Sequence, residues 1–400
     1  MARSSERWQL LAFAVAHLVV FLVIFRFVYQ IQYTPVAIYD NDASAVLGGK
    51  LPYRDFSFEY PPLSLLVFLL PGYFSSSWQG FASIYQVEIL VFDLVGLFLI
   101  YLIARRLGKA PWVMLGVYTL GVLAVGPIIQ NQYDIFPAVV TLAAVYFFWL
   151  GRHKTAWFLV GLGALLKLYP LLLVPIWLIV YWRNHEYRRI WSGLATLLLT
   201  CLIILLPFLI LSPSSLLRLL DYHTQRGIQI ESLYGAFLML FHNLGWVASR
   251  LVFNFGSWNL MGPVPETLDK LSTYFLVVAW VASFALVYWQ VRAGKSQFSR
   301  MGSYFLIILL LTLLTSKILS PQYLIWLIPF LPLVGGPLRV YVWALFVIIG
   351  GLTYYNFPAH YLKLMAFGNP EIIVLLARDL LLAAMAVLAI VNLRRMKASD

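Results

Sequence analysis

The chain has 400 residues, of which 62% are hydrophobic and only 11% are charged, and its mean hydropathy is +0.85. A soluble domain is about half apolar and about a quarter charged, so this composition excludes a soluble globular protein and indicates a chain embedded in lipid. The net charge of +12 is a topology signal, because the basic residues gather on one side of the predicted spans. No nucleic-acid partner is expected.

Apolar runs that suit membrane-spanning helices recur along the whole chain. A helix needs about 20 apolar residues to cross a bilayer, and unbroken rather than alternating runs favour helices over a closed barrel. The runs fall near 8–30, 80–104, 111–129, 134–150, 155–167, 169–182, 191–212, 272–291, 302–316, 321–335, 338–353 and 371–392. We therefore predict an all-α, polytopic bundle of about 12 spans that forms one membrane-embedded domain over residues 1–400.

Two apolar segments do not fit a simple count of spans. The run at 61–73 is too short to cross a bilayer and is flanked by prolines, so we predict a re-entrant or surface helix there. The run at 155–182 has basic residues at both ends, which predicts a hairpin of two short helices that meet near 167–170. The residues after Lys317 repeat this pattern with a proline-containing turn at 320–321.

Basic residues identify the cytoplasmic side. They cluster in alternate links and at both ends: Arg3, Arg7, Arg105, Arg106, Lys109, Arg152, Lys154, Arg183, Arg188, Arg189, Arg292, Lys295, Arg300, Arg339, Arg394, Arg395 and Lys397. Short links rich in Lys and Arg stay cytoplasmic, which places both termini inside. Most acidic residues fall in the other links, so the two long ones, at about 31–79 and 213–271, are expected to face outward.

The first long outer link carries the densest group of polar residues. Its segment YDNDASAVLGGKLPYRDFSFEYPP contains Asp40, Asp42, Arg54, Asp55, Glu59 and Tyr60. The piece DASAVLGGK predicts a short surface helix that ends at its glycine pair. Ionisable groups clustered with aromatic residues beside apolar spans are typical of a functional site; a solvated loop is the alternative.

Four further polar clusters lie at predicted outward ends of spans or in the second long link. They are Gln130, Gln132 and Asp134; Lys167 and Tyr169; Lys317, Gln322 and Tyr323; and His223 with Arg226. Two lysines at equivalent hairpin tips favour an anion site. The structural alternatives are a polar turn, a lysine that extends to the lipid headgroups, and a solvated loop.

Charged residues also fall inside predicted spans. Glu88 and Asp93 lie in one span, and Arg378 and Asp379 lie in another. Buried charges in lipid are costly and usually pair, so we expect structural pairs there and a hydrogen-bonded core histidine at His17.

Motifs of soluble enzymes are absent from the sequence. It has no P-loop, dinucleotide-binding fingerprint, zinc-ligand spacing or nucleophile elbow. We therefore expect no cofactor. A divalent metal stays open, because Asp40 and Asp42 alone are a weak signal for metal ligands.

The run VLGGKLPYRDFSFEYPPLSLLVFLLP resembles the first-loop signature of glycosyltransferase family 87, a family of integral-membrane enzymes in the GT-C superfamily. The resemblance continues through NQYDIFPAVV and the Lys-x-Tyr-Pro tip and covers most of the chain. It implies inverting transfer of a sugar, mannose by default, from a polyprenyl-phosphate donor to a lipid or glycan acceptor outside the cytoplasm. It also implies an essential acid in the first outer loop. This chain has Thr34 and Pro35 at the family's position, which leaves Asp40 and Asp42 as candidates.

The chemistry of such a transfer assigns predicted roles. The departing phosphate needs cations, for which the candidates are Arg54, Lys167, Arg226 and Lys317. The acceptor hydroxyl needs a base, for which the candidates are Asp40, Asp42 and His223. Substrate-binding candidates are Asp55, Glu59, Tyr60, Gln130, Gln132, Asp134, Tyr169, Gln322 and Tyr323.

Two other classes of protein remain as alternatives. A secondary transporter or lipid flippase places ionisable groups near the midplane and often has repeated halves, whereas most polar clusters here lie at outward helix ends. A structural subunit would not need clustered outer acids and cations. Compact links and the lack of an N-glycosylation sequon favour the plasma (inner) membrane of a prokaryote, with membrane lipids around the chain.

Overall fold

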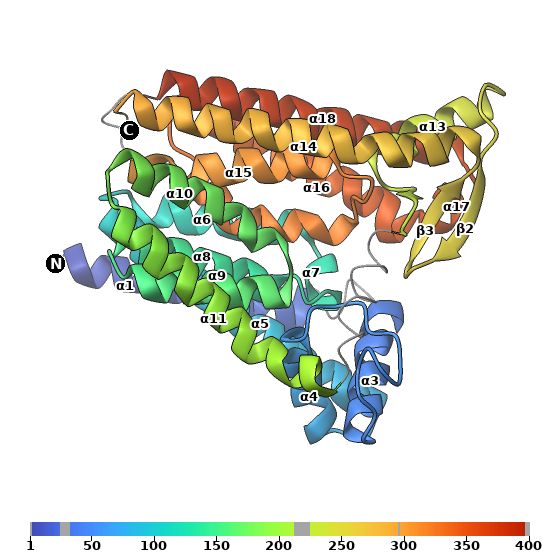
Figure 1. Ribbon diagram of the computed structural model, residues 1–400, viewed down its shortest axis with the longest axis horizontal. Coiled ribbons are helices and arrows are strands. Elements are labelled where there is room, and N and C mark those ends of the chain that lie inside the picture. Colours follow the sequence, from blue (N-terminus) through green and yellow to red (C-terminus); the bar gives the residue numbers. More distant parts are fainter. Residues whose placement is uncertain (1, 25–32, 212–224, 295–296, 397–400) are drawn as a thin grey trace. The chain divides into compact units, whose positions relative to one another are not determined.

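A computed structural model describes residues 2–24, 33–211, 225–294 and 297–396 (Figure 1). These ranges are almost entirely helical, which confirms the predicted all-α membrane fold. The chain forms two compact units: unit 1 comprises Met1–Leu123 and Pro127–Asp221, and unit 2 comprises Ala124–Gly126 and Tyr222–Asp400.

Unit 1 is built from helices and short helical turns. They are α1 (Ala2–Val19), η1 (Val20–Ile24), α3 (Tyr33–Leu47), α4 (Ser64–Phe74), α5 (Trp78–Arg106), α6 (Pro111–Val125), α7 (Ile128–Asn131), α8 (Ile135–Trp149), α9 (His153–Leu166), η2 (Tyr169–Leu172), α10 (Leu173–Arg183) and α11 (Tyr187–Leu211). The short helix predicted within 61–73 is present as α4. The predicted break at 167–170 is present too, because α9 ends at Leu166 and a 3-10 turn follows.

Buried polar contacts join the first helix of unit 1 to its neighbours. The imidazole Nδ1 of His17 in α1 pairs with the carboxylate of Asp93 in α5. The Nε2 atom of His17 donates to Oγ1 of Thr119 over 2.8 Å, because the Thr119 hydroxyl itself donates to the carbonyl of Leu115. Tyr118 donates to the other oxygen of Asp93 over 3.1 Å. The expected hydrogen-bonded core histidine at His17 is therefore confirmed, and Asp93 is one of its partners.

Unit 2 contains a small sheet as well as helices. Its elements are β1 (Ile228–Gln229), α13 (Leu233–Asn243), β2 (Arg250–Asn254), β3 (Ser257–Met261), α14 (Pro263–Arg292), α15 (Gln297–Thr315), η3 (Pro321–Trp326), η4 (Ile328–Leu333), α16 (Arg339–Tyr354), η5 (Tyr355–Ala359), α17 (Tyr361–Met365) and α18 (Asn369–Arg395). The strands are antiparallel in the order β1-β3-β2. This sheet occupies the second long link, where no strands were predicted.

The turn between β2 and β3 explains how the hairpin closes. Asn254 pairs with Ser257, so only Phe255 and Gly256 lie between the strands. Both have positive φ, of 48° and 67°, which is the type I′ geometry that fits the twist of a two-stranded hairpin.

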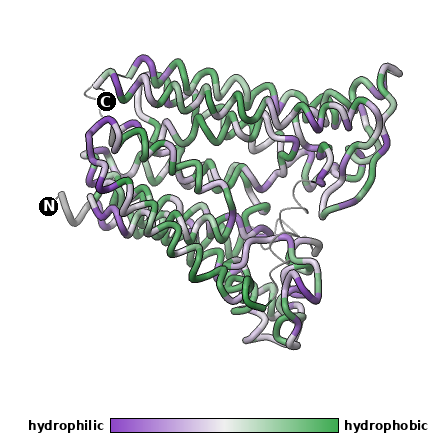
Figure 2. The backbone as a smooth tube through the Cα atoms, viewed as in Figure 1, coloured by the Kyte–Doolittle hydropathy of each residue, from purple (hydrophilic) through white to green (hydrophobic). Residues whose placement is uncertain are grey.

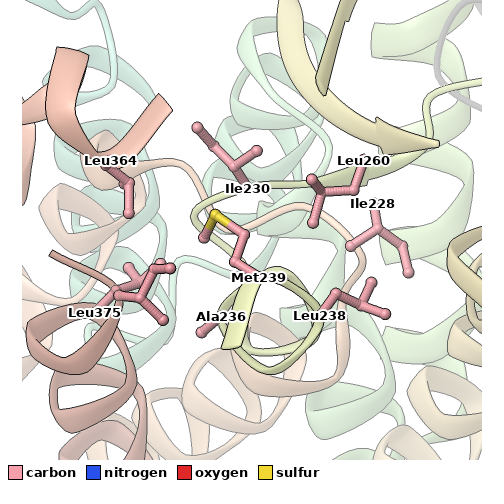
Figure 3. Close-up of a cluster of buried hydrophobic side chains, with 9 residues drawn as sticks. Ile228, Ile230, Ala236, Leu238, Met239, Leu260, Leu364 and Leu375 are labelled. Atoms are coloured by element: carbon pink, nitrogen blue, oxygen red, sulfur yellow. The ribbon is translucent and has the colours of Figure 1, made fainter. Parts of the chain in front are cut away.

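A hydrophobic cluster packs beneath the sheet of unit 2. Figure 3 shows Met239 of α13 between Ile228 and Ile230 on one side and Leu375 of α18 on the other. These side chains are at most 1% exposed, and each buried aliphatic side chain of this size contributes about 1.5–3 kcal/mol. The cluster fixes β1, α13 and α18 relative to one another.

Six helices among the described residues are long and apolar enough to cross a membrane. They are Glu6–Val23, Trp78–Arg106, Tyr187–Leu211, Pro263–Arg292, Arg339–Ala359 and Asn369–Arg395. Figure 2 shows their mainly hydrophobic character, and shorter apolar helices accompany them. The total of about 12 spans stays a prediction.

Two of the predicted helical segments differ from the structure. The run at 321–335 forms the 3-10 helices η3 and η4 rather than an α-helix, because Pro321, Pro329 and Pro332 remove backbone donors. Helix α14 begins at Pro263, before the apolar run predicted at 272–291. Its first turns are polar, so the apolar run alone does not reveal them.

Candidate active site

The first outer link folds into α3 and α4, which lie side by side at one end of unit 1 (Figure 1). Helix α3 carries Tyr39 and Asp42, and a spacing of three residues places them on the same helical face. Both are buried, with 1% and 9% of their surface exposed. Asp40 lies between them in sequence and is only half-buried. The structure therefore separates the two candidate bases by their surroundings.

Aromatic side chains surround this face of α3. The aromatic cluster comprises Tyr39, Tyr53, Phe58, Tyr60, Phe68, Tyr85 and Tyr133. The Tyr39 ring stacks on Phe68 with 4.3 Å between centroids, and Tyr60 meets Tyr133 edge-on at 4.9 Å. Such offset and edge-on pairs are favourable beyond their area burial. The cluster therefore packs around Tyr39, on the helical face that also carries Asp42.

The buried surroundings of Asp42 change the acidity of its carboxyl. Burial, and then the charge of Glu59, raise the pKa of Asp42 to about 7. Burial also raises the pKa of Asp40, without a second charged neighbour as a cause. Burial, and then the charge of Asp42, raise the pKa of Tyr53. Asp42, Glu59 and Tyr60 are thus near enough for the charges of the two acids to act on the pKa values of their neighbours.

A cation lies on another side of the same cluster. The Nζ atom of Lys167 is 4.8 Å from the centroid of the Tyr133 ring and 2.6 Å from Oδ1 of Asp134. Asp134 is completely buried, and 17% of the Lys167 side chain is exposed. The carboxylate therefore fixes the ammonium group next to the cluster, and the lysine side chain as a whole stays partly exposed.

The glutamines of the predicted turn have defined partners. Gln132 accepts a hydrogen bond from the Tyr39 hydroxyl over 3.1 Å, which ties α3 to the turn before α8. The side-chain amide of Gln130 donates to the carbonyl of Phe21 over 3.0 Å. Tyr169 is the first residue of η2 and is buried. Gln132 is therefore joined directly to the aromatic cluster through Tyr39.

Arg54 and Asp55 form a pair at the surface. The guanidinium Nε of Arg54 donates to Oδ1 of Asp55 over 2.8 Å, and 49% of the Arg54 side chain is exposed. The hydrogen bond from Arg54 is the main cause that lowers the pKa of Asp55 to about 2. The predicted roles of Arg54 in binding the donor phosphate and of Asp55 in binding substrate stay predictions.

Unit 2 contains a second lysine-carboxylate pair. The Nζ atom of Lys317 is 2.7 Å from Oδ1 of Asp269 in α14. Arg226 is buried, and its Nε donates to the carbonyl of Phe255 at the β-hairpin turn over 2.7 Å. The candidate cations of this unit therefore have partners that hold them in place.

The remaining predicted site residues are Gln322, Tyr323 and His223. Tyr323 stacks on Trp326 with 4.1 Å between centroids, and Gln322 next to it is half-buried. His223 lies outside the described residues. The described parts of the chain contain no group of three His, Cys, Asp or Glu side chains that could hold a metal ion.

Two kinds of buried residue were not predicted from the sequence. The buried tyrosines Tyr39 and Tyr133 gave no signal beyond their aromatic character, because their mutual packing depends on the fold. Glu231 was one acid among several in the long outer link, yet it is 3% exposed and hydrogen-bonded to Tyr361. Its sequence signal was the segment RGIQIES, from which we selected Arg226 instead.

The helices and apolar runs define a polytopic membrane protein, and the comparisons with known proteins identify its family. Residues 58–321 match the model of glycosyltransferase family 87. The match covers more than half of the chain, and the protein belongs to this family. The predicted family and the predicted glycosyltransferase activity are thereby confirmed. Among curated proteins, none matches the sequence.

Solved structures support the same fold. The chain resembles ArnT from Cupriavidus metallidurans bound to undecaprenyl phosphate, with a TM-score of 0.50 and 14% identity over 96% of this chain and 77% of ArnT. The apo state of the same ArnT gives a TM-score of 0.52 and 13% identity over 97% and 78%. At these identities the likeness shows a shared GT-C fold.

Proposed function

We propose that this glycosyltransferase moves a sugar, with mannose as the first choice, from a polyprenyl-phosphate donor to a lipid or glycan acceptor on the extracytoplasmic face. Membership of family 87 supports the reaction class. The undecaprenyl phosphate bound to the structurally similar ArnT supports a lipid-phosphate donor. The observation that carries the proposal is the buried carboxyl of Asp42, with a pKa of about 7, on the face of α3 that packs in the aromatic cluster, together with Lys167 over the Tyr133 ring of that cluster.

The proposed reaction is a single displacement with inversion. The acceptor oxygen forms a bond to the anomeric carbon as the bond from that carbon to the phosphate oxygen breaks. Asp42 takes the proton of the acceptor hydroxyl, and polyprenyl phosphate leaves with the bonding electrons. A base with a pKa near the operating pH is the most effective for this step.

Lys167 is the proposed cation for the departing phosphate in unit 1. Negative charge on the phosphate grows as the bond to the sugar breaks, and a fixed ammonium group stabilises that charge. Asp134 holds the lysine in place, and the exposed part of its side chain is available to the phosphate. Lys317 in unit 2, held in the same way by Asp269, is a second candidate for phosphate contact.

The arrangement of α5 supports an outward-facing site. Phe81 and Tyr85, in the first turns of this helix, pack into or beside the aromatic cluster, and its last turn carries Arg105 and Arg106. The helix has 29 residues, which corresponds to about 44 Å and is long enough to cross a bilayer. Because basic ends stay cytoplasmic, we propose that the site faces outside, in the inner membrane of a prokaryote.

A transfer assay in detergent separates this proposal from transport. The purified protein is incubated with a radiolabelled polyprenyl-phosphate sugar and a lipid acceptor, and the product and its anomeric configuration are determined. We expect a glycosylated acceptor of inverted configuration. Detergent micelles have no compartments, so a transporter or flippase would yield no product, and this result would contradict the proposal.

A further inference from the structure

The segment 228–234 clamps the Lys317 tip of unit 2 at three points. The backbone N–H of Gln229 donates to the carbonyl of Lys317 over 3.0 Å. The side-chain amide of Gln229 donates to Oγ of Ser320 over 2.9 Å. The hydroxyl of Tyr234 donates to the carbonyl of Thr315 over 3.0 Å. The tip is therefore held at the backbone carbonyls of Thr315 and Lys317 and at the side-chain hydroxyl of Ser320.

The core of unit 2 fixes one side of this segment. Ile228 and Ile230 point into the hydrophobic cluster beneath the sheet (Figure 3), and Ile228 pairs with Leu260 of β3. Strand β1 ends at Gln229, and a turn follows at Ile230 and Glu231. The side chain of Gln229 contacts Ser320, and the carboxyl of Glu231 contacts Tyr361, which packs against the same core.

Polar contacts of Glu231 fix the other side of the segment. Its carboxyl Oε1 accepts a hydrogen bond from the hydroxyl of Tyr361 in α17 over 2.7 Å. Its backbone carbonyl accepts one from Arg378 in α18, which is itself paired with Asp379 through 2.8 Å. Glu231, Arg378 and Asp379 are each at most 3% exposed. The clamp on Lys317 is thus anchored to α17 and α18 through one buried acid.

We propose that Glu231 is a positioning residue: its carboxyl, held by Tyr361, fixes the segment that clamps the Lys317 tip and thereby controls how tightly Lys317 holds the donor phosphate. The inference rests on the proposed function, in which Lys317 contacts that phosphate. Glu231 need not touch the substrate, because it acts through Gln229.

The protonation of Glu231 gives this role a measurable signature. Burial raises the pKa of Glu231 to about 7, although the hydrogen bond from Tyr361 and the charge of Arg378 oppose the rise. Asp379 is the other charged group in this network. The folded protein therefore favours the neutral carboxyl, so its stabilising contribution is complete below the unfolded pKa and is lost as pH rises through about 7. We expect the clamp, and with it donor binding, to weaken over that window.

The test measures the dissociation constant of a polyprenyl-phosphate sugar without acceptor, from about pH 6 to about pH 8, on either side of the Glu231 pKa of about 7. This donor is a phosphodiester with one charge throughout, so it does not titrate in the window. For the wild type we expect affinity to fall as pH rises. Glu231→Gln keeps an acceptor for Tyr361 and stays neutral, so its affinity should remain at the acid value. Tyr361→Phe should weaken binding at acid pH by about fivefold, the equivalent of one lost hydrogen bond.

Lys317→Met serves as the matched control, because without the ammonium group there is nothing for Glu231 to position and the pH dependence should vanish. A wild-type affinity that does not change with pH, or a Glu231→Gln variant with the wild-type dependence, would overturn the positioning role while leaving the donor assignment intact. No donor binding at any pH would instead refute the proposed function, and this inference with it.

Discussion

The ammonium group of Lys167 lies 2.6 Å from a carboxylate oxygen of Asp134, and Asp134 is completely buried. The two residues come from the turn before α8 and from the end of α9, 33 positions apart. A buried carboxylate is tolerated only with a partner. The lysine that we assign to the phosphate therefore also neutralises the fold's own buried acid.

Loss of Lys167 should consequently affect stability as well as activity. Removal of one member of a buried ion pair typically costs about 3–5 kcal/mol, because the other charge stays buried without compensation. We expect Lys167→Met to lower the melting temperature in detergent markedly. The double variant Lys167→Met/Asp134→Asn should recover most of the loss yet stay inactive. The exposed Lys154 provides the control Lys154→Met, which should melt like the wild type; an equal effect of both single variants would refute this account.

The ionised carboxylate of Asp42 should destabilise the fold near and above neutral pH. Its pKa in the folded protein, about 7, is raised above the usual value of 3.8, mainly by burial. The neutral form thus stabilises the fold, and this contribution is complete below the unfolded pKa and is lost as pH rises through about 7. Asp42→Asn is always neutral, so it should melt at a higher temperature than the wild type above neutral pH. The difference should disappear in acid; a difference that does not change with pH would contradict the assignment.

The rate should follow the same titration in the opposite direction. Only ionised Asp42 accepts the acceptor proton, so kcat at saturating donor should rise with pH and level off above about 7. Saturation with donor removes the separate effect of pH on donor binding through Glu231. A kcat that is constant or falls across this window would exclude Asp42 as the base.

Close packing of α9 and α11 gives a prediction independent of the site. A Cβ atom at Gly193 would collide with the indole of Trp157, and small residues at such positions let membrane helices approach closely. We expect Gly193→Leu to prevent folding or lower the melting temperature strongly. Ala195 lies on the exposed face of the same helix, so Ala195→Leu should be tolerated. The yield of monodisperse protein after detergent extraction measures both, and equal yields would argue against this packing.

Hydrophobicity and charge predicted the membrane fold because they report directly on solvent. Helices such as α5 and α18 begin and end within a few residues of their apolar runs. The sequence failed where local chemistry overrode hydrophobicity: the prolines of 321–333 impose 3-10 turns. It also failed where pairing is long-range, as in the strand contact between Ile228 and Leu260.

The candidate site was likewise predicted only in part from the sequence. The sequence located acids in the first outer link and lysines at two tips, since these residues stand out against apolar surroundings. It did not distinguish Asp42 from Asp40, because that depends on the burial of one face of α3 and on Glu59, which is 17 positions away. Nor did it reveal that Asp134 and Asp269 hold the two lysines, since each pair forms only in the folded chain.

The central claim is that Asp42 accepts the proton of the acceptor hydroxyl. The most direct measurement compares kcat for sugar transfer in the wild type, in Asp42→Asn and in Asp40→Asn, each purified in detergent and shown to be folded by a cooperative melting transition. General-base catalysis contributes about 10²–10⁴-fold, so we predict a loss of that size for Asp42→Asn with unchanged donor affinity. Asp40→Asn should retain most of the activity. Near-normal kcat in Asp42→Asn, or the larger loss in Asp40→Asn, would contradict the claim.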